Sequence, residues 1–133
     1  KKQKGGKVMG YYSQLYFDLI KVKVDKEKLA EVEEFFKSGH SDIYAFADVY
    51  FEVSDNGELH DIVLQDYWGK FYDDELFAEM LSEAIVEGQV DLQFNGEDGT
   101  QWCYRVSKGK VEELHSIWLT QAELKKVIEC LRK

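Results

Sequence analysis

The sequence predicts one α+β domain built around a mainly antiparallel sheet, and three observations lead to this fold class. The length of 133 residues suits a single domain that buries its own core. Hydrophobic residues make up 44% of the chain and aromatic residues 14%, which is typical of a folded protein. Segments with alternating apolar residues are interleaved with segments of helical periodicity, in the order β-α-β-β-α-β-β-β-α.

The first three elements are expected to be a strand, a helix and a strand. Tyr12–Val24 alternates, but its apolar parity changes near Leu19, which predicts a bulge or bend there. Asp25 is a suitable N-cap for a helix over Lys26–Lys37. Ala45–Val53 then alternates as a strand with one face toward the core.

A hairpin, an aromatic loop and a second helix follow. Asp55-Asn56-Gly57 is a hairpin turn signal, and Glu58–Asp66 is the predicted return strand. The aromatic loop Tyr67–Tyr72 precedes a predicted helix over Asp74–Glu87. We expect Gly88 to end this helix.

The remaining elements are a predicted meander and a C-terminal helix. The three strands are expected over Val90–Phe94, Gln101–Val106 and Val111–Leu119. Thr120 and Glu123 match a capping box, which predicts a helix over Gln121–Arg132.

The first six elements follow the split βαβ order of ferredoxin-like folds. This likeness concerns the fold alone, because that fold hosts many unrelated activities. The predicted core consists of apolar residues that share a helix or strand face. These residues are Leu29, Val32, Phe36, Val49, Phe51, Leu76, Met80, Leu81, Val90, Leu92, Leu124 and Val127.

Composition narrows the setting in which the protein works. There is no proline, and no apolar run approaches the roughly 20 residues of a membrane span. The N-terminal residues lack the apolar stretch of a secretory signal. Cys103 and Cys130 are the only cysteines, so neither a disulfide framework nor a CxxC metal pattern is present. We therefore expect a cytoplasmic protein.

Residues 1–8 differ from the rest of the chain. They are basic and glycine-containing and precede Met9. Back-translation of Lys-Gly-Gly-Lys resembles a bacterial ribosome-binding site, which predicts a translated leader and a bacterial or phage source. A cloning remnant or a short native basic tail is the alternative. The single α+β domain is then residues 9–133.

Charge is the most uneven property of the chain. Residues 38–104 carry sixteen acidic residues and one basic residue, Lys70, whereas the whole chain has a net charge of −9. Direct binding of DNA or RNA is not expected, because such binding depends on a basic surface. The two readings are a solvated acidic surface and a surface that binds a basic partner.

The acidic residues recur at spacings that place several on one surface. Glu75, Glu79, Glu83 and Glu87 lie four residues apart, with no Lys or Arg on the same predicted helix. Like charges at this spacing destabilise a helix. The predicted acidic surface comprises Glu75, Glu79, Glu83, Asp48, Glu52 and Asp61.

The aromatic loop is the second candidate site. Tyr67, Trp68, Phe71 and Tyr72 are either a small core that caps the sheet or a patch that contacts a protein partner. Residues suited to catalysis or metal binding do not form a known pattern. The histidines His40, His60 and His115 have no metal-ligand spacing, and no metal or cofactor is expected.

These observations favour binding over catalysis. We expect an inhibitor or immunity-type protein that docks on a basic protein surface. The most specific form of this hypothesis is that it mimics nucleic acid and binds a nucleic-acid-binding protein. One alternative is a small enzyme with a carboxylate/histidine centre. The other is an assembly subunit that associates through the aromatic patch. The oligomeric state stays open.

Overall fold

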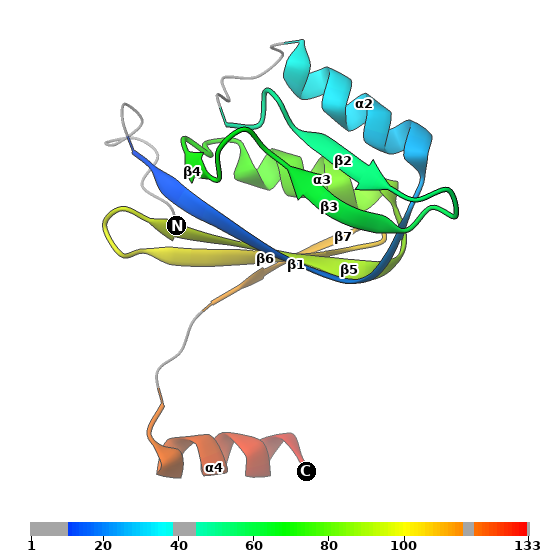
Figure 1. Ribbon diagram of the computed structural model, residues 1–133. Coiled ribbons are helices and arrows are strands. Elements are labelled where there is room, and N and C mark those ends of the chain that lie inside the picture. Colours follow the sequence, from blue (N-terminus) through cyan, green and yellow to red (C-terminus); the bar gives the residue numbers. More distant parts are fainter. Residues whose placement is uncertain (1–10, 39–44, 116–118, 133) are drawn as a thin grey trace.

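The computed structural model describes residues 11–38, 45–115 and 119–132 and shows a single-domain α+β fold (Figure 1). Residues 1–8, expected to be a leader or a tail, lie outside this range. The predicted order of helices and strands is confirmed, with one additional two-residue strand. Within the described residues, no helix combines the length and the apolar character needed to cross a membrane.

A five-stranded antiparallel sheet forms one layer, in the order β4-β1-β5-β6-β7. Its strands are β1 (Ser13–Val24), β4 (Trp68–Gly69), β5 (Ile85–Gly96), β6 (Gln101–Ser107) and β7 (Lys110–Leu114). The long β1–β5 ladder sets Leu15 opposite Phe94 and Leu19 opposite Val90, so apolar residues share the core face.

The second layer covers this core face (Figure 1). It contains α2 (Lys26–Lys37), α3 (Asp74–Ala84) and a hairpin of β2 (Tyr50–Val53) and β3 (Leu59–Val63). The two hairpin strands pair only with each other, as a separate sheet. Two backbone hydrogen bonds reach β1 from this side: the Val24 amide donates to the carbonyl of Gly57 in the hairpin turn at 2.9 Å, and the Leu15 amide donates to the carbonyl of Tyr67, just before β4, at 2.7 Å.

Several predicted boundaries are wrong: the return strand expected over Glu58–Asp66 ends at Val63, and the last strand expected over Val111–Leu119 ends at Leu114. The strand expected over Ala45–Val53 begins at Tyr50, after a turn. The second helix ends at Ala84, and Glu87 lies in β5, where it pairs with Lys23. Ile85 continues the helical apolar spacing, but Ile85 and Val86 have high strand propensity and belong to β5, which pairs with β1 from Ile85 onward.

Gly88 has a different role from the predicted helix stop. It lies in β5 with φ of +86°, and a β-carbon built there would lie 2.1 Å from the Lys21 carbonyl oxygen. Lys21 itself has φ of 48°, and the pairing of β1 with β5 is irregular between Ile20 and Lys23. The predicted bulge is therefore confirmed close to its expected position, and only glycine fits opposite it.

The core is rich in aromatic rings. Phe77 of α3 stacks on Phe46 with ring centroids 4.1 Å apart and approaches Phe36 and Phe51 at 5.6 and 6.1 Å. Most predicted core residues are buried, while Leu76 and Met80 are half-buried.

Asp74 is a buried carboxylate at the start of α3, and its side chain is 0% exposed. It accepts hydrogen bonds from the Trp102 indole at 2.5 Å and from the Tyr104 hydroxyl at 3.2 Å. Burial, followed by the charge of Asp74, raises the pKa of Tyr104 above its ordinary value. The three side chains therefore fix the start of α3 to the core face of β6.

The C-terminal helix α4 (Gln121–Leu131) corrects the prediction that Leu124 and Val127 are core residues. These side chains are 47% and 44% exposed, and no residue of α4 is buried. Figure 1 shows α4 on the side of the sheet opposite α2 and α3. The predicted capping box is confirmed: the Thr120 side chain accepts from the Glu123 amide at 3.1 Å, and the Glu123 carboxylate accepts from the Thr120 amide at 2.9 Å.

Gly88→Ala should lower the free energy of unfolding by about 3 kcal/mol, because it combines a strained φ with backbone overlap. Gly99→Ala is the matched control. Gly99 has φ of +88°, but no atom lies within 4 Å of an added β-carbon. Urea unfolding of both variants measures the difference, and equal losses would contradict the close approach.

Asp74→Ala should lower the free energy of unfolding by about 3 kcal/mol, because it removes the acceptor shared by Trp102 and Tyr104. Asp74→Asn keeps an acceptor oxygen in nearly the same volume and should cost less. Urea unfolding tests the order of the two variants. An alanine variant as stable as the wild type would show that this carboxylate does not hold α3.

Thr120→Ala should reduce the helicity of α4 while leaving the unfolding of the α+β body unchanged. The cap contributes about 1 kcal/mol to its helix, and an isolated helix of this length is marginal in water. Circular dichroism measures the helicity, and the melting of buried Tyr104 in the near-ultraviolet reports on the body. A parallel loss of both signals would contradict the independence of α4.

Candidate protein-binding surfaces

The outward face of the β2–β3 hairpin carries carboxylates. Tyr50 and Glu52 are exposed and lie opposite Val63 and Asp61 in the ladder. Glu52 and Asp61 therefore form a like-charged cross-strand pair, which is unfavourable for the hairpin. Within the described residues neither carboxylate forms an ion pair, so their negative field is open to a partner.

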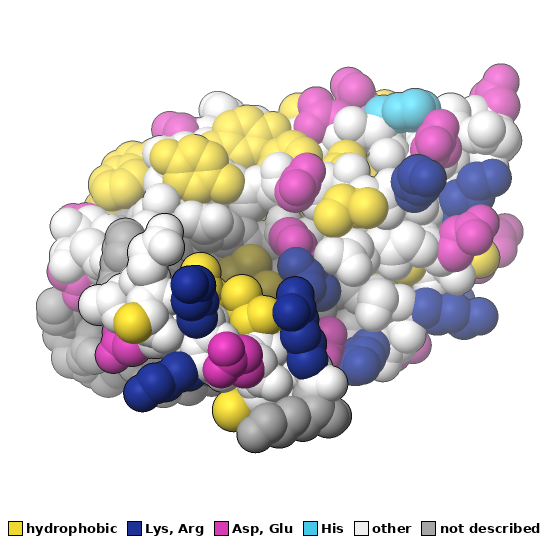
Figure 2. Space-filling view, turned by 90° about the horizontal axis from the view of Figure 1, so that it is seen from below, with side chains coloured by type: hydrophobic (Ala, Val, Ile, Leu, Met, Phe, Trp, Pro, Cys, Tyr) yellow, Lys and Arg dark blue, Asp and Glu magenta, His cyan; other side chains and the backbone are white. Residues whose placement is uncertain are grey.

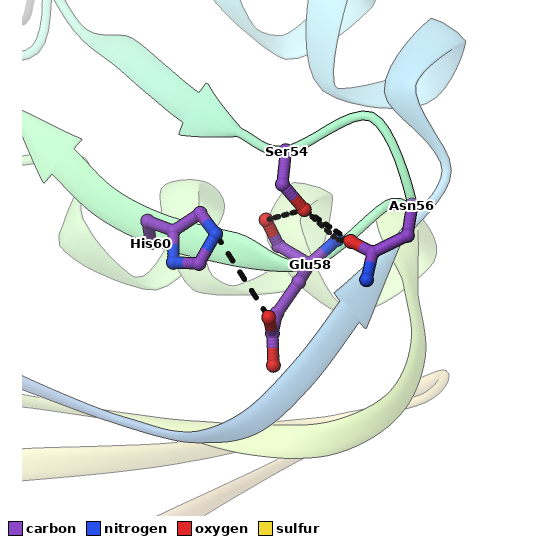
Figure 3. Close-up of polar contacts among 4 residues, drawn as sticks. All are labelled: Ser54, Asn56, Glu58 and His60. Carbon is purple, nitrogen blue, oxygen red and sulfur yellow. Dashed lines mark hydrogen bonds and ion pairs between the residues drawn. The ribbon is translucent and has the colours of Figure 1, made fainter.

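Polar contacts fix the turn at one end of this face (Figure 3). The Ser54 hydroxyl donates to the Asn56 side-chain oxygen and accepts from the Glu58 amide at 3.2 Å. His60 Nε2 lies 3.8 Å from Glu58 Oε1. The predicted turn is thus a hydrogen-bonded structure that holds the carboxylate-bearing strands in register.

An open groove of about 520 Å³ lies at the other end of the hairpin. Its walls include the rings of Tyr12 and Trp68, which stack with centroids 5.9 Å apart and an interplanar angle of 14°. Lys70 places its ammonium group 5.6 Å from the centre of the Tyr12 ring. Asp48 and Asp66 also line the groove and are exposed. The groove therefore combines an aromatic platform with carboxylates.

The aromatic loop divides between core and surface. Phe71 is 3% exposed and packs between core rings, so it departs from the surface role considered for it. The Tyr67 hydroxyl donates to the Ile62 carbonyl at 2.7 Å, and the Tyr72 hydroxyl accepts from the Tyr11 amide at 3.1 Å. Both tyrosines are half-buried. Trp68 alone of the four is exposed, at 42%.

Acidic residues of α3 form a second surface. Glu79 and Glu83 are exposed, and Glu75 is half-buried. The predicted row of four is shortened to three, because Glu87 is in β5. α3 contains no Lys or Arg, so its carboxylates have no intrahelical cation.

The two acidic surfaces lie over different parts of the main sheet. The hairpin contacts β1, whereas α3 contacts β5, β6 and β7; α2 contacts both α3 and β2. Asp48, Glu52 and Asp61 thus belong to one surface, and Glu79 and Glu83 belong to the other.

The side of the molecule that carries α4 and the face of the main sheet turned away from α2 and α3 has a different character (Figure 2). Basic and acidic side chains are interspersed on this side of the molecule, with large apolar side chains gathered toward one end (Figure 2). Arg105 makes two 3.0 Å hydrogen bonds to the Asp91 carboxylate across β5 and β6. The mixed charges of this face make it less suited to a purely basic partner than the hairpin or α3.

Chemistry-bearing side chains do not converge in the part of the chain that the structure describes. No group of three or more His, Cys, Asp or Glu side chains there could hold a metal ion. Cys103 and His115 line a depression of about 80 Å³, where burial raises the pKa of the Cys103 thiol. Burial and the Asp98 carboxylate raise the pKa of Tyr11 to about 12, so this hydroxyl stays protonated at neutral pH.

Sequence reasoning missed Tyr12 as a member of the groove. Tyr12 comes from the segment that leads into β1, and Trp68 comes from β4, the additional short strand. Their proximity follows from the pairing of β1 with β4, which sets Gln14 opposite Trp68. A two-residue strand has no recognisable local sequence pattern. The contact between Tyr12 and Trp68 could therefore not be predicted from the sequence.

No family model matches the chain, and comparisons with curated proteins and with solved structures found no match.

Proposed function

We propose that this protein is a small acidic binding protein of the inhibitor or immunity type, which docks on a basic protein surface. The observation that carries the proposal is a set of carboxylates without cation partners in the described residues: Asp48, Glu52, Glu79 and Glu83 are exposed, and Asp61 is half-buried. A field of one sign attracts a surface of the opposite sign and speeds association.

The arrangement of these carboxylates favours recognition over simple solvation. Glu79 and Glu83 repeat at roughly 6 Å along α3, and Glu52 opposes Asp61 across the hairpin. Both arrangements cost folding stability, since like charges at these positions repel. A basic partner would offset this repulsion. Regular carboxylates of this kind could occupy the site where a nucleic-acid-binding protein holds phosphates, so such a protein is the partner we propose.

An assembly subunit is the second candidate, favoured by α4. Four apolar side chains share one face of this helix at helical spacing and are exposed: Leu124, Val127, Ile128 and Leu131. An amphipathic helix without a buried face is typical of segments that associate with another protein. The two candidates differ in salt response, because apolar association is not weakened by screening as charge attraction is.

The double variant Glu52→Lys/Glu79→Lys should slow association with a captured basic partner by about tenfold at low salt. The same variant should be as stable as the wild type or slightly more stable, because each lysine faces carboxylates in place of a like charge. Capture from lysate of the native host identifies the partner, and stopped-flow association with the purified partner measures the rate.

Glu31→Lys/Glu129→Lys is the control, because it changes the net charge equally at exposed positions on α2 and α4, outside the hairpin and α3. It should slow association far less. If both variants slowed association equally, the slowing would come from the change in net charge and not from the acidic surfaces. Unchanged association in the double variant at low salt would contradict the proposal.

A further inference from the structure

The geometry points to the Tyr12–Trp68 groove as a receptor for an arginine side chain of the basic partner. This inference deepens the proposed function and rests on it, since it names the chemical group that the acidic protein grips. The groove lies beside the hairpin, because Asp48, in the turn before β2, lines the groove, and Tyr50 and Glu52 follow it along the chain on the outward side of β2. The acidic hairpin face therefore continues into the groove.

The aromatic platform already holds a cation of this protein. The Lys70 ammonium lies 5.6 Å from the centre of the Tyr12 ring, within the range of a cation–π interaction. Tyr12 is in turn stacked on Trp68, whose side chain is 42% exposed. Tryptophan is the best of the aromatic side chains for this interaction. The exposed indole thus provides a site for a second cation, one brought by a partner.

The carboxylates of the groove complement the same group. Asp48 is exposed and makes no ion pair within the described residues. Asp66 uses one oxygen to accept from the Trp68 amide at 3.0 Å, which holds the tryptophan backbone in place and leaves its second oxygen for a ligand. Two carboxylates against the one ammonium of Lys70 disfavour an anionic ligand.

Arginine fits this combination better than lysine. Its planar guanidinium stacks flat on an aromatic ring and donates along its edge to a carboxylate in a fixed fork, whereas an ammonium is a strongly hydrated point charge. The groove offers both surfaces, with Trp68 as the stacking ring and Asp48 and Asp66 as acceptors. Its volume of about 520 Å³ and its open side admit one side chain of an extended or structured partner.

A short fluorescein-labelled oligoarginine peptide is the probe, measured by fluorescence anisotropy at low salt. Trp68→Ala should weaken its binding roughly threefold to fivefold, and Trp68→Phe should fall between the alanine variant and the wild type. Tyr16→Ala is the matched control, because Tyr16 is 52% exposed but does not line the groove. It should leave binding unchanged.

Lys70→Gln gives a change in the opposite direction. Removal of the resident cation should tighten oligoarginine binding about twofold or more, since one repulsive charge leaves the groove. Oligolysine of equal length should bind more weakly than oligoarginine to the wild type and respond less to Trp68→Ala. Thermal unfolding of each variant shows that the fold is retained.

Unchanged oligoarginine binding in Trp68→Ala, or equal binding of oligoarginine and oligolysine, would overturn the assignment and leave only diffuse attraction between charges. The two proposals fail separately. If partner association is slowed by Glu52→Lys/Glu79→Lys but not by Trp68→Ala, the arginine assignment alone is wrong. If the groove binds oligoarginine as expected and the charge variant leaves partner association unchanged, the proposed function alone is wrong.

Discussion

The aromatic packing around Phe77 holds together the elements of the second layer. The position of the acidic hairpin depends on this packing. The Phe77 ring contacts Phe36 of α2, Phe46 in the turn before β2, and Phe51 of β2. The hairpin shares no continuous ladder with the main sheet, so apolar packing supplies most of its anchorage. Inward burial of Phe51 turns its neighbours Tyr50 and Glu52 outward. The charged surface is thus oriented by the aromatic core beneath it.

Elements with local chemical signals are predictable from the sequence, and the boundary between α3 and β5 is not. The N-cap at Asp25, the turn at Gly57 and the capping box at Thr120 depend on neighbouring residues alone, and the structure contains all three. Glycine with positive φ serves helix ends and bulges equally well, so Gly88 is ambiguous in sequence. The ladder with β1 resolves the ambiguity through a long-range contact.

The candidate site divides in the same way. Strand alternation places Glu52 on the outward side, and it is exposed; Asp48, predicted to share that strand, is also exposed but lies in the turn before it. The density of aromatic residues in the loop does not distinguish Phe71, which is buried, from Trp68, which is exposed. That difference arises from the pairing of β4 with β1, and so does the meeting of Trp68 with Tyr12. The two aromatic rings of the groove belong to Tyr12 and Trp68, which are 56 positions apart in the sequence. The groove is therefore a feature of the tertiary structure.

The exposure of α4 also has a consequence for how its sequence is constrained. Side chains in a domain core are selected because their loss unfolds the domain. No side chain of α4 is buried, so its apolar stripe contributes no such packing to the body. Substitutions there would pass any selection that acts through thermodynamic stability of the α+β body alone. The α+β body can therefore fold without the apolar face of α4, which is made of residues at helical spacing: Leu124, Val127, Ile128 and Leu131.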